Sequence, residues 1–291
     1  MISILISIVG GILCALTYST MDHASWGIYI IGVIGTLVSF ILINRWKQKP
    51  LNEIIQGVQA KLQDAQTQVQ KKANHFQSRP GGNQTAFMKT AEKIQSKATE
   101  EAIELLKAAE PFYKWNFLIE KQIDTMRFQL NYQIKNFEQA DMYMGKVMLM
   151  DPSVVTMKMA RLYKKDPLDR DAVQDPSTKS KILKNWSVSK VFHKGKGRMK
   201  GANAVLVYGT YAWMLNKTGL HTEALEILLE GAKKTADEVM LQNIERLRND
   251  KPKSFSNAKY GEVWYALYLE EPAKQKQKMK RQSARNAGRP F

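Results

Sequence analysis

The sequence has very few of the residues that form covalent cross-links or bind metal ions. Its 291 residues include a single cysteine, which excludes an intramolecular disulfide and a zinc site built on two thiolates of one chain. The four histidines lie far apart, and no two of them have the i,i+3 or i,i+4 spacing of a helical ligand pair. We therefore expect neither a metal ion nor a cofactor.

Motifs of catalysis are also missing. The sequence contains no nucleophile elbow, zinc-protease helix, dinucleotide fingerprint or kinase motif. Acidic residues such as Glu223, Glu226 and Glu230 recur at helical spacing beside lysines, which is typical of a solvated helix face. These observations predict that the protein is not an enzyme, and no catalytic residue is assigned.

Charged residues are nearly absent from the first 44 positions. This stretch contains no Lys or Arg and one acid, Asp22, whereas the whole chain has 44 Lys and Arg, 27 Asp and Glu, and a net charge of +17. Two apolar runs, residues 2–20 and 26–44, each match the roughly 20 residues that cross a bilayer as a helix. The five residues MDHAS between them allow only a tight turn. The sequence thus predicts a transmembrane hairpin over residues 1–46.

Basic residues at the ends of the hairpin predict its orientation. Arg45, Lys47 and Lys49 follow the second run, while the turn has no Lys or Arg, so both termini should be cytoplasmic. We expect an integral protein of a bacterial inner membrane. No ionisable residue lies inside either run, which argues against an ion path. A cleaved signal peptide is the alternative for the first run, but a basic start and an A-x-A cleavage site are missing.

Small residues recur along both apolar runs. In the first run they come every four positions, which predicts close contact with a second helix. The residues are Ser3, Ser7, Gly11, Ala15 and Ser19, with Gly32, Gly35, Thr36 and Ser39 as the matching face. Packing within the hairpin and contact with another membrane protein are both compatible with this pattern.

Residues 47–85 predict an amphipathic helix followed by a linker. After Pro50, apolar residues such as Ile55, Val58 and Leu62 form a narrow seam of coiled-coil type. The seam suits self-association or packing against the next domain. Because Pro80 and two glycines interrupt the pattern, a helical domain should begin near residue 86.

From residue 86 to 271 the apolar residues recur at spacings of three and four, with short breaks and little strand-like alternation. This pattern predicts an all-α fold, arranged as a bundle or as a stacked helical repeat. The last segment, residues 272–291, is basic and lacks an apolar face, so we expect a disordered tail.

One part of this domain, YGTYAWMLNKTGLHTEALEILLEGAKK, resembles a tetratricopeptide repeat, a pair of antiparallel helices. The matching residues are Tyr208, Tyr211, Ala212, Leu215, Gly219, Ala224, Leu228 and Gly231. His221 departs from the usual aromatic, and Ala236 replaces the terminal proline. Residues 131–152 resemble a second, degenerate copy through Phe137, Ala140, Met144 and Pro152, without the turn glycine.

The resemblance implies a groove that binds protein and is lined by first helices of the repeats. The residues expected to face such a groove are Tyr208, Trp213, Asn216 and Lys217. Two basic segments without acids are candidates for binding anions or lipid. They contribute Lys194, Lys196, Arg198 and Lys200 from the first segment and Lys274, Lys276, Lys278, Lys280 and Arg281 from the tail. A solvated loop, an anionic leaflet, nucleic acid and an acidic protein all remain open for them.

These features together predict a membrane-anchored, non-enzymatic adaptor or scaffold that binds a protein partner through its helices. Two alternatives remain open. The chain is a structural subunit of a membrane protein complex, or its basic segments recruit nucleic acid or ribosomes to the membrane.

Overall fold

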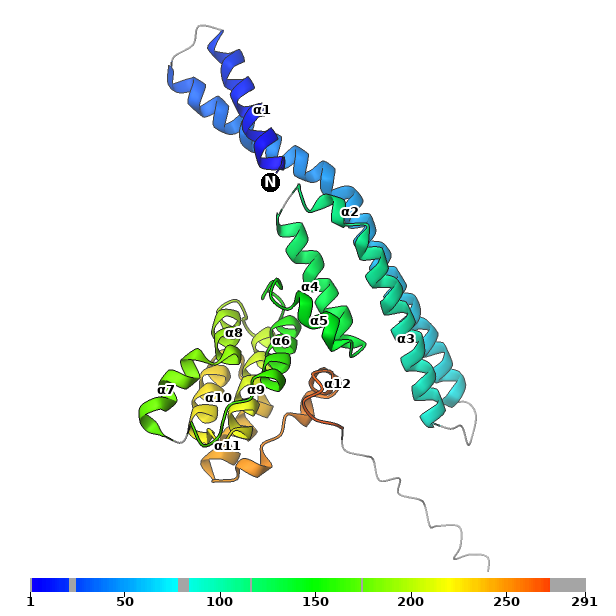
Figure 1. Cartoon of the computed structure of the whole chain (residues 1–291), viewed down its shortest axis with the longest axis vertical. Helices are drawn as coiled ribbons and strands as arrows, with labels where there is room; N and C mark the ends of the chain where they lie inside the picture. Colours follow the sequence, from blue (N-terminus) through cyan, green and yellow to red (C-terminus); the bar gives the residue numbers. More distant parts are fainter. Residues whose placement is uncertain (1, 21–24, 78–83, 116, 174, 273–291) are drawn as a thin grey trace, which may run out of the picture. The chain divides into compact units, whose positions relative to one another are not determined.

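The computed structural model describes residues 2–20, 25–77, 84–115, 117–173 and 175–272, and these residues form helices joined by turns without any strand (Figure 1). The predicted all-α fold is confirmed. The helices are α1 (Ile2–Ser19), α2 (Ser25–Gln77), α3 (Gln84–Lys107), η1 (Glu110–Phe112), α4 (Phe117–Gln133), α5 (Phe137–Tyr143), α6 (Pro152–Lys165), α7 (Pro176–Asn185), α8 (Ser187–Lys196), α9 (Ala202–Lys217), α10 (His221–Thr235), α11 (Glu238–Arg248), η2 (Pro252–Ser254), η3 (Ala258–Tyr260) and α12 (Glu262–Tyr265).

The chain divides into two compact units. Unit 1 comprises the residues up to 161 together with 193–199, and unit 2 comprises residues 162–192 and the chain from 200 onward. The predicted tail and the centres of both predicted connections, 21–24 and 78–83, lie outside the described residues.

Unit 1 begins with a helical hairpin in which α1 packs against the first part of α2. Both helices contain a segment long and apolar enough to cross a membrane. A Cβ atom at Gly11 would lie 1.8 Å from the Thr36 hydroxyl and 2.6 Å from the Gly32 carbonyl oxygen. Small residues therefore bring the helices into contact, and the predicted packing of the two small faces is confirmed.

Helix α2 is 53 residues long and continues without a break through Pro50, although the sequence favoured a separate helix after residue 46. A proline inside a helix costs about 3 kcal/mol because it removes a hydrogen bond and crowds the preceding turn. Leu51 and Val58 are buried against the following helices, and burial of each contributes roughly 1.5–3 kcal/mol. Packing therefore offsets the cost of Pro50.

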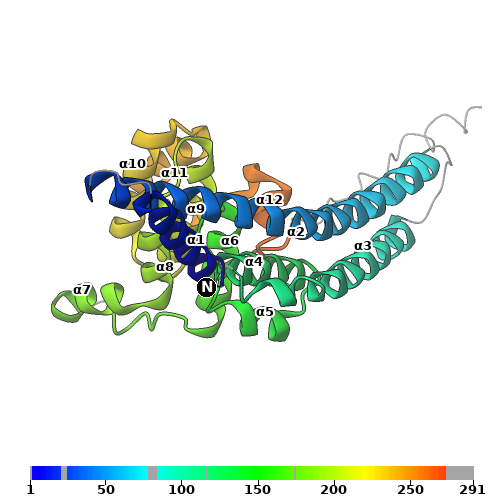
Figure 2. The ribbon, with the colours of Figure 1, turned by 90° about the horizontal axis from the view of Figure 1, so that it is seen from above.

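Helices α2 and α3 run side by side, as both views show (Figures 1 and 2). Their contact, completed by α4, forms an apolar core. Its buried members are Leu51 and Val58 from α2, Ala102 and Leu106 from α3, Ala109, and Ile119, Ile123 and Leu130 from α4. The seam expected after Pro50 thus packs against the next helices of the same chain.

Unit 2 is built around α9, which is buried on nearly every side. Helix α10 packs against α9, and α11 packs against α10, which gives a packing like that of helical repeats. Aromatic rings fill the remaining space, as in the stack of Phe192 on Tyr211 at 4.1 Å between centroids.

The spacing of apolar residues predicts helices over 136–150 and 257–271, and both are shorter in the structure. Helix α5 ends at Tyr143 and not near residue 150, and residues 257–271 form only the one-turn elements η3 and α12. Lys135, Asp250 and Tyr268 have positive φ angles, so the backbone turns sharply at or near these segments.

Candidate functional site

The base of the hairpin is held by the turn that follows η1. The Ile2 amide donates to the Lys114 carbonyl at 3.1 Å, and the Ser3 hydroxyl donates to the Trp115 carbonyl at 2.6 Å. Residues 114 and 115 thereby satisfy polar groups in the first turn of α1, which has no preceding turn to bond with. This turn and the start of α1 form one structural element.

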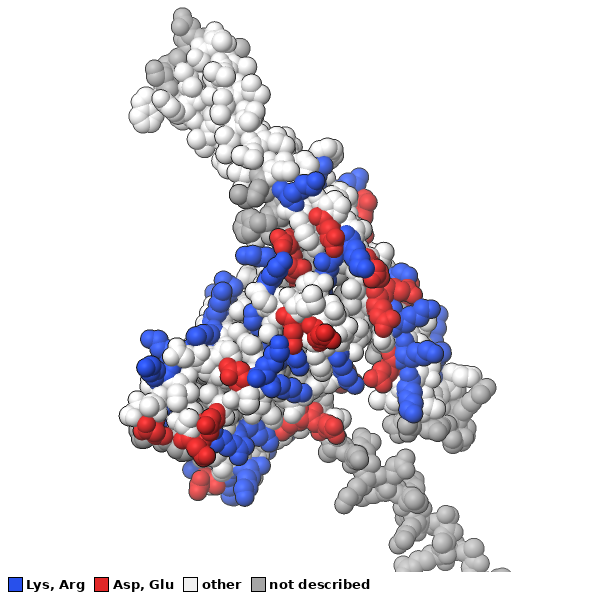
Figure 3. All heavy atoms as spheres, viewed as in Figure 1, with Lys and Arg blue, Asp and Glu red and all other residues white. Residues whose placement is uncertain are grey.

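Lys47 completes this contact from α2. Its ammonium lies 4.1 Å from the ring centroids of both Trp46 and Trp115, which is a cation–π geometry with two partners. The Trp46 side chain is nevertheless 70% exposed. On the face drawn in Figure 3, the hairpin carries no charged side chain, and Lys and Arg begin where α2 leaves it. This junction, formed by the start of α1, the turn at 114–115 and Lys47, therefore marks the boundary between an apolar and a charged surface.

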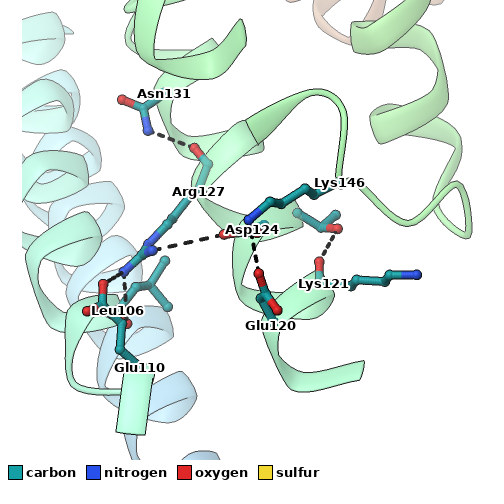
Figure 4. A network of polar contacts seen from close by, with 9 residues as sticks. Leu106, Glu110, Glu120, Lys121, Asp124, Arg127, Asn131 and Lys146 are labelled. Carbon is teal, nitrogen blue, oxygen red and sulfur yellow. Dashed lines mark hydrogen bonds and ion pairs between the residues drawn. The ribbon is translucent and has the colours of Figure 1, made fainter. Parts of the chain in front are cut away.

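A buried polar network lies on α4 (Figure 4). The Arg127 guanidinium, with 8% of its side chain exposed, donates to the Glu110 carboxylate at 2.7 Å and to the Leu106 carbonyl at 3.5 Å. It also lies 4.0 Å from the Asp124 carboxylate. The Asn131 amide donates to the Arg127 carbonyl at 2.8 Å. Arg127 therefore joins α4 to the end of α3 and to η1.

Burial raises the pKa of Asp124, and the nearby Lys146 and Arg127 charges offset this effect only in part. The Lys146 ammonium lies 3.7 Å from Asp124 and 2.9 Å from Glu120. Burial also raises the pKa of Tyr113 to about 12, which keeps its phenol protonated. The ion pairs of Asp124 with Arg127 and Lys146 form a structural clamp between these elements.

A groove of about 1140 Å³ lies beside this clamp, between α3 and the segment formed by the end of α4 and α5. Its apolar lining includes Ile103, Leu105 and Ile134, and its charged lining along α3 has a lysine at each end and three glutamates between them. The charged residues of α3 are Lys97, Glu100, Glu101, Glu104 and Lys107. The volume slightly exceeds the range of typical small-molecule sites, and the lining suits a polypeptide segment with apolar side chains and both charge signs.

Three of the four residues predicted to bind a partner are buried, so the expectation that they face an open groove is wrong. The Tyr208 hydroxyl donates to Glu230, the Trp213 indole donates to Glu270, and the Asn216 amide donates to the Pro252 carbonyl. Only Lys217 is exposed. The physical reason is that residues 252–270 contribute partners to Trp213 and Asn216, while α10 packs against Tyr208.

The first basic segment is part helix and part loop. Lys194 and Lys196 belong to the last turn of α8, and only Arg198 and Lys200 lie in the turn that follows. A Cβ at Gly195 would lie 2.9 Å from the Val155 side chain, so this glycine serves close packing. Lys194, Arg198 and Lys200 are exposed. The predicted tail residues Lys274, Lys276, Lys278, Lys280 and Arg281 lie outside the described residues.

Among the described residues, no group of three or more His, Cys, Asp or Glu side chains could hold a metal ion. Comparison with known proteins yields no matching family, no matching curated protein and no matching solved structure. The function is therefore inferred from the junction, the clamp and the groove.

Proposed function

We propose that this protein is a non-enzymatic adaptor, anchored in a bacterial inner membrane with both termini cytoplasmic, that holds a protein partner in the unit 1 groove. The observation that carries the proposal is the continuity of α2. Its first part is an exposed apolar segment of membrane-spanning length, and Lys61 further along the same helix lines the groove. One rigid element thus links anchor and groove.

This continuity sets the distance between the partner and the bilayer. Sixteen residues of α2 separate Arg45 from Lys61, which at 1.5 Å per residue corresponds to about 24 Å. Because each headgroup layer is about 5–8 Å thick, a segment bound in the groove is held clear of it, on the order of 16–19 Å further out along α2. Such a fixed height is useful to an adaptor that presents a partner to another membrane component.

The lining of the groove favours a polypeptide over a nucleic acid. Its three glutamates balance its three lysines, so the lining lacks the excess of positive charge that attracts a phosphate backbone. An amphipathic helix with Lys and Glu beside its apolar face would pair with both charge signs along α3. The alternative of nucleic acid recruitment therefore depends on the basic segments of the chain and not on this groove.

A tetratricopeptide-like character of unit 2 is part of the proposal. It is supported by the contact of α9 with α10, in which Ala212, Ala224 and Gly231 are all buried. Small side chains at these positions are what the repeat requires for close approach of its two helices. In this proposal the partner binds mainly to unit 1, and the exposed face of unit 2 around Lys217 is a second surface for contact with it.

The proposal is tested by photo-crosslinking of the full-length chain in membranes. A photoreactive residue replaces Leu105, which is 37% exposed in the groove, or Leu241, a comparably exposed residue of unit 2. We expect a protein adduct from position 105 and little from position 241. Lys97→Glu should abolish the adduct, whereas Lys233→Glu, on an exposed face of α10, should not.

Other outcomes identify the alternatives. Equal adducts from both positions, or adducts insensitive to Lys97→Glu, would contradict the groove. A photoreactive residue at Val33, on the exposed surface of the hairpin, tests the alternative that the chain is a structural subunit of a membrane protein complex. Protein adducts from Val33 alone would favour that alternative, and adducts with nucleic acid would favour recruitment.

A further inference from the structure

A small cavity lies at the base of the hairpin, between α2 and the beginning of α4. Its volume is about 330 Å³, and its described lining includes four primary amides, one lysine and one tryptophan but no carboxylate. These residues are Asn44, Gln48 and Asn52 of α2, Gln122 of α4, Lys47 and Trp115. The three α2 amides are four residues apart, so one side of the helix presents all of them.

The polar lining is suited to an oxyanion. Each primary amide carries two N–H donors, and those of Gln48, Asn52 and Gln122 belong to exposed side chains. Lys47 adds a positive charge, and its two cation–π contacts hold the ammonium beside the cavity. Hydrogen bonds from a cation to an anionic oxygen are roughly twice as strong as neutral ones. A phosphate group matches this set of donors.

The cavity also lies where a phospholipid headgroup would be found. Asn44 is the last residue before the first cation of the chain, and α2 is apolar up to that point. On the other helix, Ser3 at the start of α1 is bonded to Trp115 of the cavity wall. Both apolar helices therefore end at the level of the cavity. Trp46, 70% exposed beside it, is typical of the membrane interface.

We propose that this cavity binds the phosphate of an anionic phospholipid headgroup. The inference rests on the proposed membrane anchoring. Lys47 and the amides contact the phosphate, and the acyl chains extend along the exposed apolar surface of the hairpin. The bound lipid fills the space between α2 and α4 and so stabilises the junction that connects the hairpin to the cytosolic helices.

The test measures lipid retention by the full-length chain purified in mild detergent. Native mass spectrometry compares bound phosphatidylglycerol with bound phosphatidylcholine. We expect preferential retention of phosphatidylglycerol, reduced about tenfold by Lys47→Gln, since a hydrogen bond from a cation to an anionic oxygen contributes at least about this factor. Arg45→Gln and Lys49→Gln are matched controls, because they remove the same charge from the same helix outside the cavity lining. Their effect should be small.

Equal losses from all three charge variants would show unspecific attraction and overturn the site. Equal retention of the two lipids would also overturn it. Displacement of the lipid by millimolar inorganic phosphate would identify free phosphate as the ligand. If Lys47→Gln has a weaker helical circular dichroism signal than the natural chain, Gln48→Leu replaces it in the test, because Gln48 is an exposed residue of the cavity lining. Phosphatidylglycerol retention unchanged by Gln48→Leu would then overturn the site. Extraction of the chain by alkaline carbonate would refute the anchoring itself, whereas failure of the lipid site alone would leave anchoring and the Leu105 adducts intact.

Discussion

At the scale of single residues, Arg127 and Asp124 are two charges inside the apolar core of unit 1. A buried charge with hydrogen-bonding partners contributes little net stability, but removal of one partner leaves the other uncompensated. Arg127 has the Glu110 carboxylate and the Leu106 carbonyl as partners. Asp124 depends on Arg127 and Lys146, and its pKa is raised by burial despite them. The two residues should therefore respond differently to neutralisation.

We predict that Arg127→Met destabilises the full-length chain by about 3–5 kcal/mol at neutral pH, because it leaves Asp124 and Glu110 without the guanidinium. Asp124→Asn should cost much less, since the raised pKa shows that the site disfavours the charged carboxylate. The double variant should be more stable than Arg127→Met alone. Denaturant unfolding in detergent measures these differences. A double variant as unstable as the two losses added together would contradict the coupling.

The pH dependence has a definite sign. The folded state holds the Asp124 proton more tightly than the unfolded state, so this contribution to stability is present at low pH and is lost as pH rises through the raised pKa. Asparagine has no such dependence. The unfolding midpoint of Asp124→Asn should therefore increase relative to that of the natural chain between about pH 4 and pH 7. A relative decrease over this range would show that the carboxylate is net stabilising.

At the scale of helices, the contact between α9 and α10 depends on Gly231. A Cβ at this position would lie 2.9 Å from the Tyr208 Cβ and 3.0 Å from the Met240 sulfur. We predict that Gly231→Ala lowers the free energy of unfolding by about 1–3 kcal/mol through overpacking. Gly57→Ala in α2 is the control, because no atom lies within 4 Å of the added Cβ. Alanine has the higher helix propensity, so this change should raise the free energy of unfolding by as much as about 1 kcal/mol. Equal effects would contradict the close contact.

Helix spacing in the sequence predicted several elements well. The recurrence of apolar residues at three and four predicts helices over 153–165, 202–218 and 221–234. Helices α6, α9 and α10 begin and end within two residues of these positions, because their ends coincide with Pro152, Gly201 or the turn at Gly219. The continuation of α2 through Pro50 was not predictable from local rules. It depends on burial of Leu51 against helices that follow later in the chain.

The candidate sites were also hard to predict, because they depend on contacts between residues far apart in the sequence. Lys47 and Trp115 are 68 residues apart in sequence, and only the packing of α2 beside α4 brings them together. Asp124 and Arg127 offered a local signal, since they stand three residues apart among buried residues of α4 such as Ile123 and Phe128. Charges inside an apolar helix face indicate a buried network. The burial of Trp213 could not be anticipated, because residues far along the chain, such as Glu270, cover it.

For the whole molecule, the distribution of charge is the feature that connects sequence to location. The first 44 residues contain Asp22 as their one Asp, Glu, Lys or Arg, so the remaining 247 residues carry a net charge of +18, against +17 for the whole chain. Arg45, Lys47 and Lys49 follow the second apolar helix directly. A bilayer favours basic residues on its cytoplasmic side, where the leaflet is negative.

The resulting topology can be tested with reporters in living cells. A reporter that functions only in the cytoplasm should be active when fused after Phe291 and inactive when inserted into the sequence MDHAS, because two spans return the chain to its starting side. Replacing Arg45, Lys47 and Lys49 together by glutamine should weaken this preference, whereas glutamine at Lys71, Lys72 and Lys89, more than 25 residues beyond the span, should not. An active reporter in the turn of the natural chain would reverse the orientation. Activity at both positions would show that the hairpin does not cross the membrane.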